Sequence, residues 1–186
     1  MLPVLIPEYF CLISGVGVHE EDKVAQDLAG RPAGIADRNI QKITSVLPPG
    51  CKEHPLKFFR EQTRNGQFIA AVDGKCKTSV EGQIVSAGLA VTIPHDPEVT
   101  GYFAEIYEEV GLLSDILRKR VEKASLQIFA NNNGAEDTFV ADREWQNGKT
   151  EYVIGGRRVT LQSVVASGVG QGKGKYTLAY VGAILL

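Results

Sequence analysis

Residues 84–93 read Ile-Val-Ser-Ala-Gly-Leu-Ala-Val-Thr-Ile, and this stretch decides the class of fold. It is rich in small and β-branched residues, which is typical of a strand that is buried on both faces. The turn Pro94-His95-Asp96-Pro97 ends it, and residues 102–107 form the next predicted strand. A doubly buried strand needs other structure on each of its faces, so the run predicts a layered domain.

The best-defined helix is predicted over residues 113–129. Its apolar side chains recur at steps of three and four, so they share one face, and most of its charged side chains lie on the other. A weaker helix is predicted over residues 20–33, where Gly30 and Pro32 disfavour helical structure. Further strands are predicted at 9–14, 39–47, 67–72, 152–154, 158–165 and 176–186, with a hairpin turn at Gly155-Gly156. Five to eight strands with two helices predict an α+β fold in a single domain, residues 1–186.

Composition and charge exclude several classes of function. The chain has 186 residues, an apolar fraction of 44% and a net charge of -2 with scattered basic residues, which argues against nucleic-acid and membrane partners. Three cysteines and three histidines at wide spacings form neither a disulfide framework nor a metal site. The N-terminal residues lack the pattern of a signal peptide, so a soluble cytoplasmic protein is expected.

A glycine-rich segment, residues 167–175, invites comparison with a phosphate-binding loop. Such a loop needs a glycine five residues before its Gly-Lys pair, but Ser167 and Val169 occupy those positions in the two frames. We therefore interpret the segment as a hairpin loop before the last strand.

Residues 44–49 read Thr-Ser-Val-Leu-Pro-Pro, which on its own indicates only a strand that ends in a turn. The motif is one of an ordered set: Gly15-Val16-Gly17, Asp27, Asn39, Ile43-Thr44-Ser45-Val46-Leu47-Pro48-Pro49, Ser86-Ala87, Ile93-Pro94, Gly101 and Glu105. In order and spacing this set resembles the pyruvoyl-dependent arginine decarboxylases. The resemblance covers residues 8–110 well and continues more weakly through residues 152–186.

The chemistry of decarboxylation explains why such a family needs a special group. An α-amino acid loses carbon dioxide only if the carbanion left behind is delocalised, and a carbonyl that forms a Schiff base with the substrate amine provides this. Pyridoxal phosphate is the usual carbonyl, but the sequence shows no phosphate cradle for it. A pyruvoyl group is the alternative that a protein makes from its own chain.

The resemblance implies that this chain makes its pyruvoyl group by autocatalytic cleavage between Thr44 and Ser45. The zymogen would become a small chain of residues 1–44 and a large chain of residues 45–186, with Ser45 converted to the pyruvoyl group. The enzyme would then convert L-arginine to agmatine and carbon dioxide, for polyamine biosynthesis or acid resistance. The family also implies a four-layer αββα sandwich and a homotrimer, or a larger assembly, with active sites between subunits.

The resemblance assigns roles to three more residues. Glu105 matches the acid that protonates the decarboxylated carbon, and a carboxyl that burial keeps protonated suits that role. Asp27 matches the carboxylate that pairs with the substrate guanidinium, to which it can offer two parallel hydrogen bonds. Asn39 matches a residue that hydrogen-bonds near the pyruvoyl group and the substrate carboxylate. No metal is implied.

Two departures from the family leave alternatives open. Residues 28–32, Leu-Ala-Gly-Arg-Pro, replace bulkier helix-forming residues beside Asp27, so the substrate is less firmly indicated than the reaction. The segment 131–148 is longer than in compact members and has no assigned function. The alternatives are a pyruvoyl-dependent decarboxylase of another amino acid such as histidine, a structural relative that does not cleave itself, and a small-molecule binding module.

Overall fold

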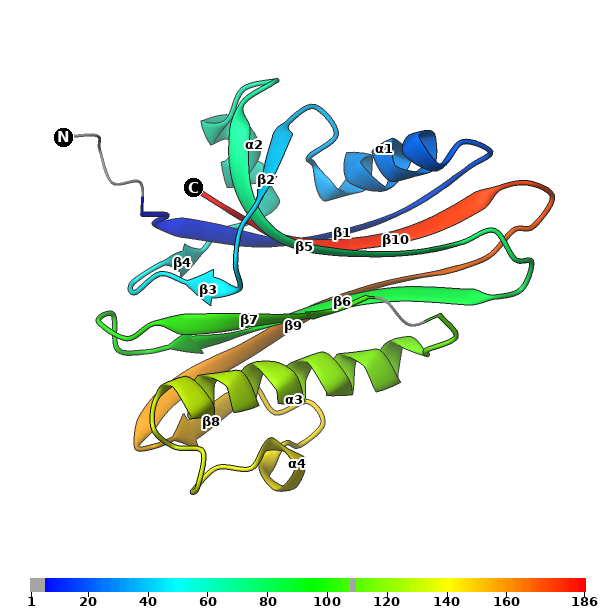
Figure 1. Cartoon of the computed structure of the whole chain (residues 1–186). Helices are drawn as coiled ribbons and strands as arrows, with labels where there is room; N and C mark the ends of the chain where they lie inside the picture. The colour runs from blue at the N-terminus through cyan, green and yellow to red at the C-terminus, as the bar shows by residue number, and fades with distance from the viewer. Residues whose placement is uncertain (1–5, 108–109) are drawn as a thin grey trace.

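The computed structural model describes residues 6–107 and 110–186, and in them two five-stranded sheets lie face to face with helices on their outer faces (Figure 1). The first sheet has the strand order β2 (Asn39–Lys42), β5 (Phe68–Thr78), β10 (Tyr176–Leu185), β1 (Tyr9–His19) and β4 (Lys52–Glu53). The second has the order β3 (Val46–Leu47), β7 (Gly101–Ile106), β6 (Ile84–Pro94), β9 (Arg157–Val169) and β8 (Glu151–Ile154).

The helices complete a four-layer αββα arrangement. Helices α1 (Asp22–Ala33) and α2 (Leu56–Gln62) cover the first sheet, whereas α3 (Ser114–Asn132) and the short α4 (Ala141–Glu144) lie on the side of the second. The predicted α+β class and layering are thus confirmed, although α2 and α4 were not predicted. No helix of the described residues is long and apolar enough to span a membrane.

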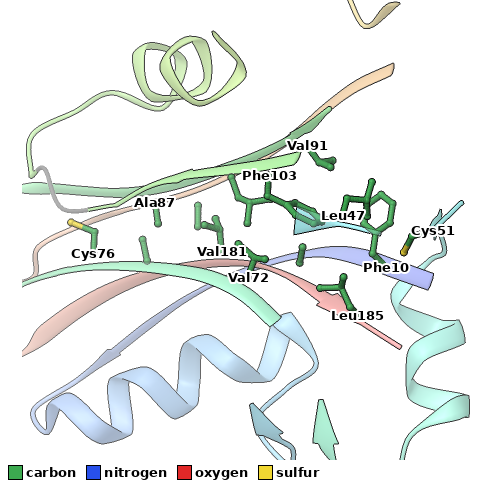
Figure 2. Packing of buried hydrophobic residues seen from close by; sticks show 14 of the residues in the cluster. Phe10, Leu47, Cys51, Val72, Cys76, Ala87, Val91, Phe103, Val181 and Leu185 are labelled. Atoms are coloured by element: carbon green, nitrogen blue, oxygen red, sulfur yellow. The ribbon is translucent and has the colours of Figure 1, made fainter. Parts of the chain in front are cut away.

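The largest core fills the space between the two sheets (Figure 2). Phe10 of β1 meets Phe103 of β7 edge to face, with ring centroids 5.9 Å apart, an arrangement that aromatic pairs favour. The predicted central strand, β6, lies in the middle of its sheet between β7 and β9, and Val85 to Val91 are buried. Its small residues allow the second sheet to pack closely on both faces, as the composition of the stretch indicated.

Strand β1 is longer than the predicted strand 9–14, because glycines allow it to pass directly under α1. A Cβ on Gly15 would lie 2.0 Å from the carbonyl oxygen of Ala29, and one on Gly17 would lie 2.0 Å from that of Ala25. Real side chains do not fit at such distances. The two glycines therefore do not end the strand but let the helix pack against it.

The predicted single strand 39–47 is wrong, because the chain changes sheets within it. Residues 39–42 pair in parallel with β5 of the first sheet, and residues 46–47 pair antiparallel with β7 of the second. Residues 43–45 bridge the two sheets at their β2 and β3 edges, and the partly buried Ile43 packs against the core between them. Ser45 consequently lies in a connection and not within a regular strand.

The interpretation of residues 167–175 as a hairpin loop is also wrong. Strand β9 continues to Val169 in the second sheet and β10 begins at Tyr176 in the first, so the loop crosses between sheets and is not a hairpin. The hairpin predicted at Gly155-Gly156 is confirmed, since β8 and β9 pair antiparallel around it.

Candidate active site

Ser45 and Glu105 are in direct contact. The Ser45 hydroxyl Oγ donates a hydrogen bond of 2.8 Å to the Glu105 carboxylate Oε2, and both residues are half-buried. The pairing of β3 with β7, in which Val46 lies opposite Tyr102, brings them together. The resemblance had named these two residues sixty positions apart, and the fold makes them neighbours.

Gly101 allows the strand that carries Glu105 to pack closely in this place. A Cβ at Gly101 would lie 2.6 Å from the carbonyl oxygen of Thr92 and 2.8 Å from Leu47. A larger residue would push β7 away from both β6 and β3. Gly101 therefore has a structural role, because it lets β7 lie close enough to β3 for Glu105 to reach Ser45.

Backbone hydrogen bonds hold both carbonyls that flank Ser45. The Val46 N–H donates to the Thr44 carbonyl at 2.8 Å, which closes a three-residue turn centred on Ser45. The Phe103 N–H donates to the Ser45 carbonyl at 3.0 Å. The Thr44–Ser45 peptide bond is thus oriented from both sides.

A lysine that sequence reasoning missed lies close to this pair. Lys42 Nζ donates to the Asp73 carbonyl at 2.9 Å, and it lies 3.5 Å from the Asp73 carboxylate and 3.5 Å from the Tyr107 hydroxyl. Partial burial alone would lower the pKa of Lys42, but Asp73, Tyr107 and Glu105 together raise it. The three strands that meet here, β2, β5 and β7, are distant in sequence, so no local pattern could have indicated the cluster.

Asp27 lies apart from Ser45, on α1. Its Oδ2 accepts a hydrogen bond from Arg31 Nε at 3.1 Å and lies 3.0 Å from Arg31 Nη2 in an ion pair, one turn along the same helix. Asp27 lines a cleft of about 360 Å³ whose wall includes Arg38 and Tyr180. The Tyr180 hydroxyl is buried and has no hydrogen-bond partner among the described residues, and burial followed by the nearby Asp73 carboxylate raises its pKa.

Asn39 begins β2 and is exposed, and its Nδ2 donates to the Gly66 carbonyl at 2.6 Å. Within residues 6–107 and 110–186, no hydrogen bond or ion pair joins Asp27 or Asn39 to Ser45 or Glu105. The structure of one chain therefore brings together two of the predicted site residues and leaves the other two apart.

A metal centre is not apparent in the described part of the chain, where no three histidine, cysteine or acidic side chains cluster. The three cysteines are buried, and none of them is in a disulfide. Burial raises the pKa of the Cys51 thiol to about 12, and burial with the Glu53 charge raises that of Cys11 to about 11.

The residues around Ser45 fit a pyruvoyl group. Conversion of a serine to pyruvoyl retains the carbonyl that follows it, so the Phe103 N–H would go on holding that carbonyl. Glu105 would remain beside the converted residue, because its strand is fixed by β3 and β6. An exposed Thr44 leaves room for a new chain end.

Comparison with known proteins agrees with this geometry. The model of the pyruvoyl-dependent arginine decarboxylase family matches residues 9–186. A pyruvoyl-dependent arginine decarboxylase of Nitrosopumilus maritimus is 28% identical over 182 residues, which cover 98% of each chain. Pyruvoyl-dependent arginine decarboxylase 2 of Archaeoglobus fulgidus is 35% identical over 101 residues, 54% of this chain and 64% of the relative. A probable enzyme of this kind from Chloroherpeton thalassium is 25% identical over 181 residues, 97% of this chain and 98% of the relative.

The fold is a four-layer sandwich in which Ser45 and Glu105 are hydrogen-bonded to each other. Together with a family match of this extent, these features define the class of the protein as a lyase. The chain belongs to the pyruvoyl-dependent arginine decarboxylase family. The family implies a pyruvoyl group as the electron sink and arginine as the substrate.

Proposed function

We propose that Ser45 is the precursor of the pyruvoyl group and that Glu105 starts its formation. The Ser45 Oγ attacks the Thr44 carbonyl carbon while Glu105 accepts the hydroxyl proton. The Thr44–Ser45 C–N bond breaks, the Ser45 nitrogen takes up a proton, and an ester joins Thr44 to Ser45. The hydrogen bond of 2.8 Å between Ser45 and Glu105 is the observation that carries this proposal.

The ester is then resolved by β-elimination. The Cα proton of residue 45 is removed, the Oγ–Cβ bond breaks, and Thr44 leaves as a new carboxylate terminus. Water converts the dehydroalanine at position 45 to pyruvoyl and releases ammonia. The Val46 N–H, which already donates to the Thr44 carbonyl, stabilises the negative charge that develops on this oxygen during the first attack.

The pyruvoyl group supplies a ketone that condenses with the substrate amine and takes up the electron pair left by carbon dioxide. Glu105 then donates a proton to the substrate carbon. The same carboxyl therefore accepts a proton during maturation and donates one during turnover. The hydrogen bond between Glu105 and Ser45 supports both roles.

We propose that Asp27 binds the substrate guanidinium and that Asn39 binds near the substrate carboxylate. The cleft beside Asp27 is large enough for a guanidinium group, and the guanidinium of Arg31 already forms an ion pair and a hydrogen bond with this carboxylate. The substrate must displace Arg31 from Asp27 or share the carboxylate with it.

The assembly is proposed to be a homotrimer of a single domain, cleaved into residues 1–44 and 45–186. Apolar side chains near the Ser45 edge support association, because Val46 is 43% exposed and Phe68 is 76% exposed in the single chain. Covering such residues with a second copy stabilises an oligomer. A site completed between subunits would also explain why Asp27 does not contact Ser45 within one chain.

Denaturing gel electrophoresis of purified wild-type protein and of Ser45→Ala tests this function. The wild type should give two fragments, and the variant should stay whole. Wild-type protein should release carbon dioxide from L-arginine and not from L-histidine or L-lysine. A chain that stays whole would favour a structural relative, and equal rates on several amino acids would contradict the role of Asp27.

A further inference from the structure

A second polar cleft lies at the edge of the sandwich opposite Ser45. Strand β8 pairs with β9 as far as Thr160, with one further bond from the Leu161 N–H to the Thr150 carbonyl at 2.7 Å. Beyond this point a cleft of about 520 Å³ opens between β9, α3 and residues 147–150. One wall therefore comes from the end of the long segment after α3 that had no assigned function.

A chain of hydrogen bonds fixes the α3 wall of this cleft. Arg118 Nη1 donates to Ser163 Oγ at 2.8 Å, and Ser163 donates to Glu122 Oε1 at 2.6 Å. Trp145 Nε1 donates to the other oxygen of Glu122, Oε2, at 2.8 Å. Both carboxylate oxygens of Glu122 accept hydrogen bonds, so Glu122 fixes Ser163, and Ser163 in turn fixes the guanidinium of Arg118. The Nε and Nη2 atoms of Arg118 make no hydrogen bond to the described residues. This side of the cleft, to which Lys149 adds a second positive charge, suits a carboxylate.

Two other residues that line the cleft, Gln162 and Glu53, suit a cation. The Gln162 Oε1 atom is buried and has no hydrogen-bond partner in the described part of the chain. Gln162 and Glu53 line both this cleft and an adjoining one of about 330 Å³, whose wall includes Leu47. A buried acceptor without a donor is costly unless a ligand or water supplies the donor, and the charge of Glu53 favours a cationic donor.

We propose that this cleft binds a second, non-reacting amino acid with a cationic side chain. Its carboxylate would contact Arg118 and Lys149, and its cationic end would contact Glu53 and Gln162. Leu47, which lies two residues after Ser45, lines the adjoining cleft and not this one. The proposal does not depend on the roles given to Ser45, Glu105 or Asp27.

Calorimetric titration with L-arginine tests the proposal in the double variant Ser45→Ala, Asp27→Ala, which lacks the reactive serine and the proposed guanidinium contact. We expect one L-arginine to bind per chain. Agmatine, which lacks only the carboxylate, should bind about tenfold or more weakly. An absence of L-arginine binding, or equal affinity for agmatine, would overturn the proposal.

Two further substitutions in that background locate the site. Arg118→Gln and Gln162→Leu should each weaken L-arginine binding about tenfold, whereas Gln171→Leu on the exposed loop before β10 should leave it unchanged. Gln162→Leu should not lower the melting temperature, because it removes an acceptor that has no partner. Undiminished binding in both variants would place L-arginine elsewhere and refute the site. Fragment formation by the wild type, measured separately, reports on the proposed function alone.

Discussion

At the scale of single residues, Glu105 should serve both maturation and turnover. Glu105→Gln keeps the size of the side chain, but the amide cannot accept the Ser45 proton or donate one to carbon. We expect slower fragment formation and a kcat for arginine that is about 10²–10⁴-fold lower in the fraction that matures. Gel densitometry over time and carbon dioxide release measure the two effects.

Glu98→Gln is the matched control, because Glu98 is an exposed carboxylate on the turn before β7. It should mature and react at the wild-type rate. Wild-type maturation and turnover in Glu105→Gln would show that the contact with Ser45 has no chemical role.

Asp27 and Arg31 should have opposite effects on arginine binding. Asp27→Asn removes the charge that we propose pairs with the substrate guanidinium, and a charge-assisted contact of about 1.5–3 kcal/mol predicts a KM about tenfold or more higher. Arg31→Ala removes a competitor for the same carboxylate. Since exposed ion pairs are worth about 0–1 kcal/mol, its KM should fall no more than about fivefold. Steady-state kinetics over arginine concentration measure both, and a higher KM in Arg31→Ala would contradict the competition.

At the scale of elements, the packing of α1 on β1 depends on glycine. Gly17→Ala would put a Cβ 2.0 Å from the Ala25 carbonyl oxygen, so the helix must move, at a cost of about 1–3 kcal/mol in the free energy of unfolding. Gly30, inside α1, has its nearest neighbour at 3.5 Å. Gly30→Ala should therefore stabilise the protein by about 0.5–1 kcal/mol. Urea denaturation of the Ser45→Ala forms, which avoids a cleaved chain, compares them, and equal stabilities would contradict the close approach.

Most elements could be predicted from the sequence because their local patterns agree with the tertiary structure. Strand β6 and helix α3 are strongly patterned, and both were found within three residues of their observed ends. The break within residues 39–47 was missed because it contains no glycine or proline. Its cause is tertiary, since β5 binds the first half and β7 the second. The predicted strand 9–14 is shorter than β1, because Gly15 and Gly17 were interpreted as the end of the strand. They instead allow α1 to pack against β1, and no local pattern reveals the position of that helix.

The candidate site divides in the same way. Ser45 and Glu105 were indicated by the ordered motifs and meet in the structure. Lys42, Asp73 and Tyr107 gave no signal, because each is an ordinary residue of a different segment until the sheets assemble. Arg31 was noted only as a departure from the family, although its spacing of four residues from Asp27 on a helix permits their ion pair.

At the scale of the whole molecule, the two proposed fragments should remain together after cleavage. Residues 1–44 contribute β1, α1 and β2, and β1 pairs with β10 over ten residues, from Phe10 to His19. Phe10 of the small fragment is also buried in the core between the sheets. Size-exclusion chromatography without denaturant should yield one species that contains both fragments, and they should separate only in denaturant. Spontaneous separation at neutral pH would contradict this arrangement.

The cysteines should be protected in the folded molecule. The thiolate is the form that reacts with iodoacetamide, and burial raises the pKa of Cys51 to about 12 and that of Cys11 to about 11. Both groups therefore stay protonated at pH 8, and alkylation should be far slower than that of a small thiol. Mass spectrometry should show three rapid additions in denaturant, and rapid labelling of the native protein would contradict the burial.

The identity of the new chain end at residue 45 tests the central claim most directly. Intact-mass spectrometry of the purified wild-type protein should show residues 1–44 with an ordinary carboxyl terminus. It should also show residues 45–186 lighter, by the mass of one ammonia, than a chain that begins with serine. A large fragment with the mass of a free amino-terminal serine, or a single uncut chain, would contradict the conversion of Ser45 to a pyruvoyl group.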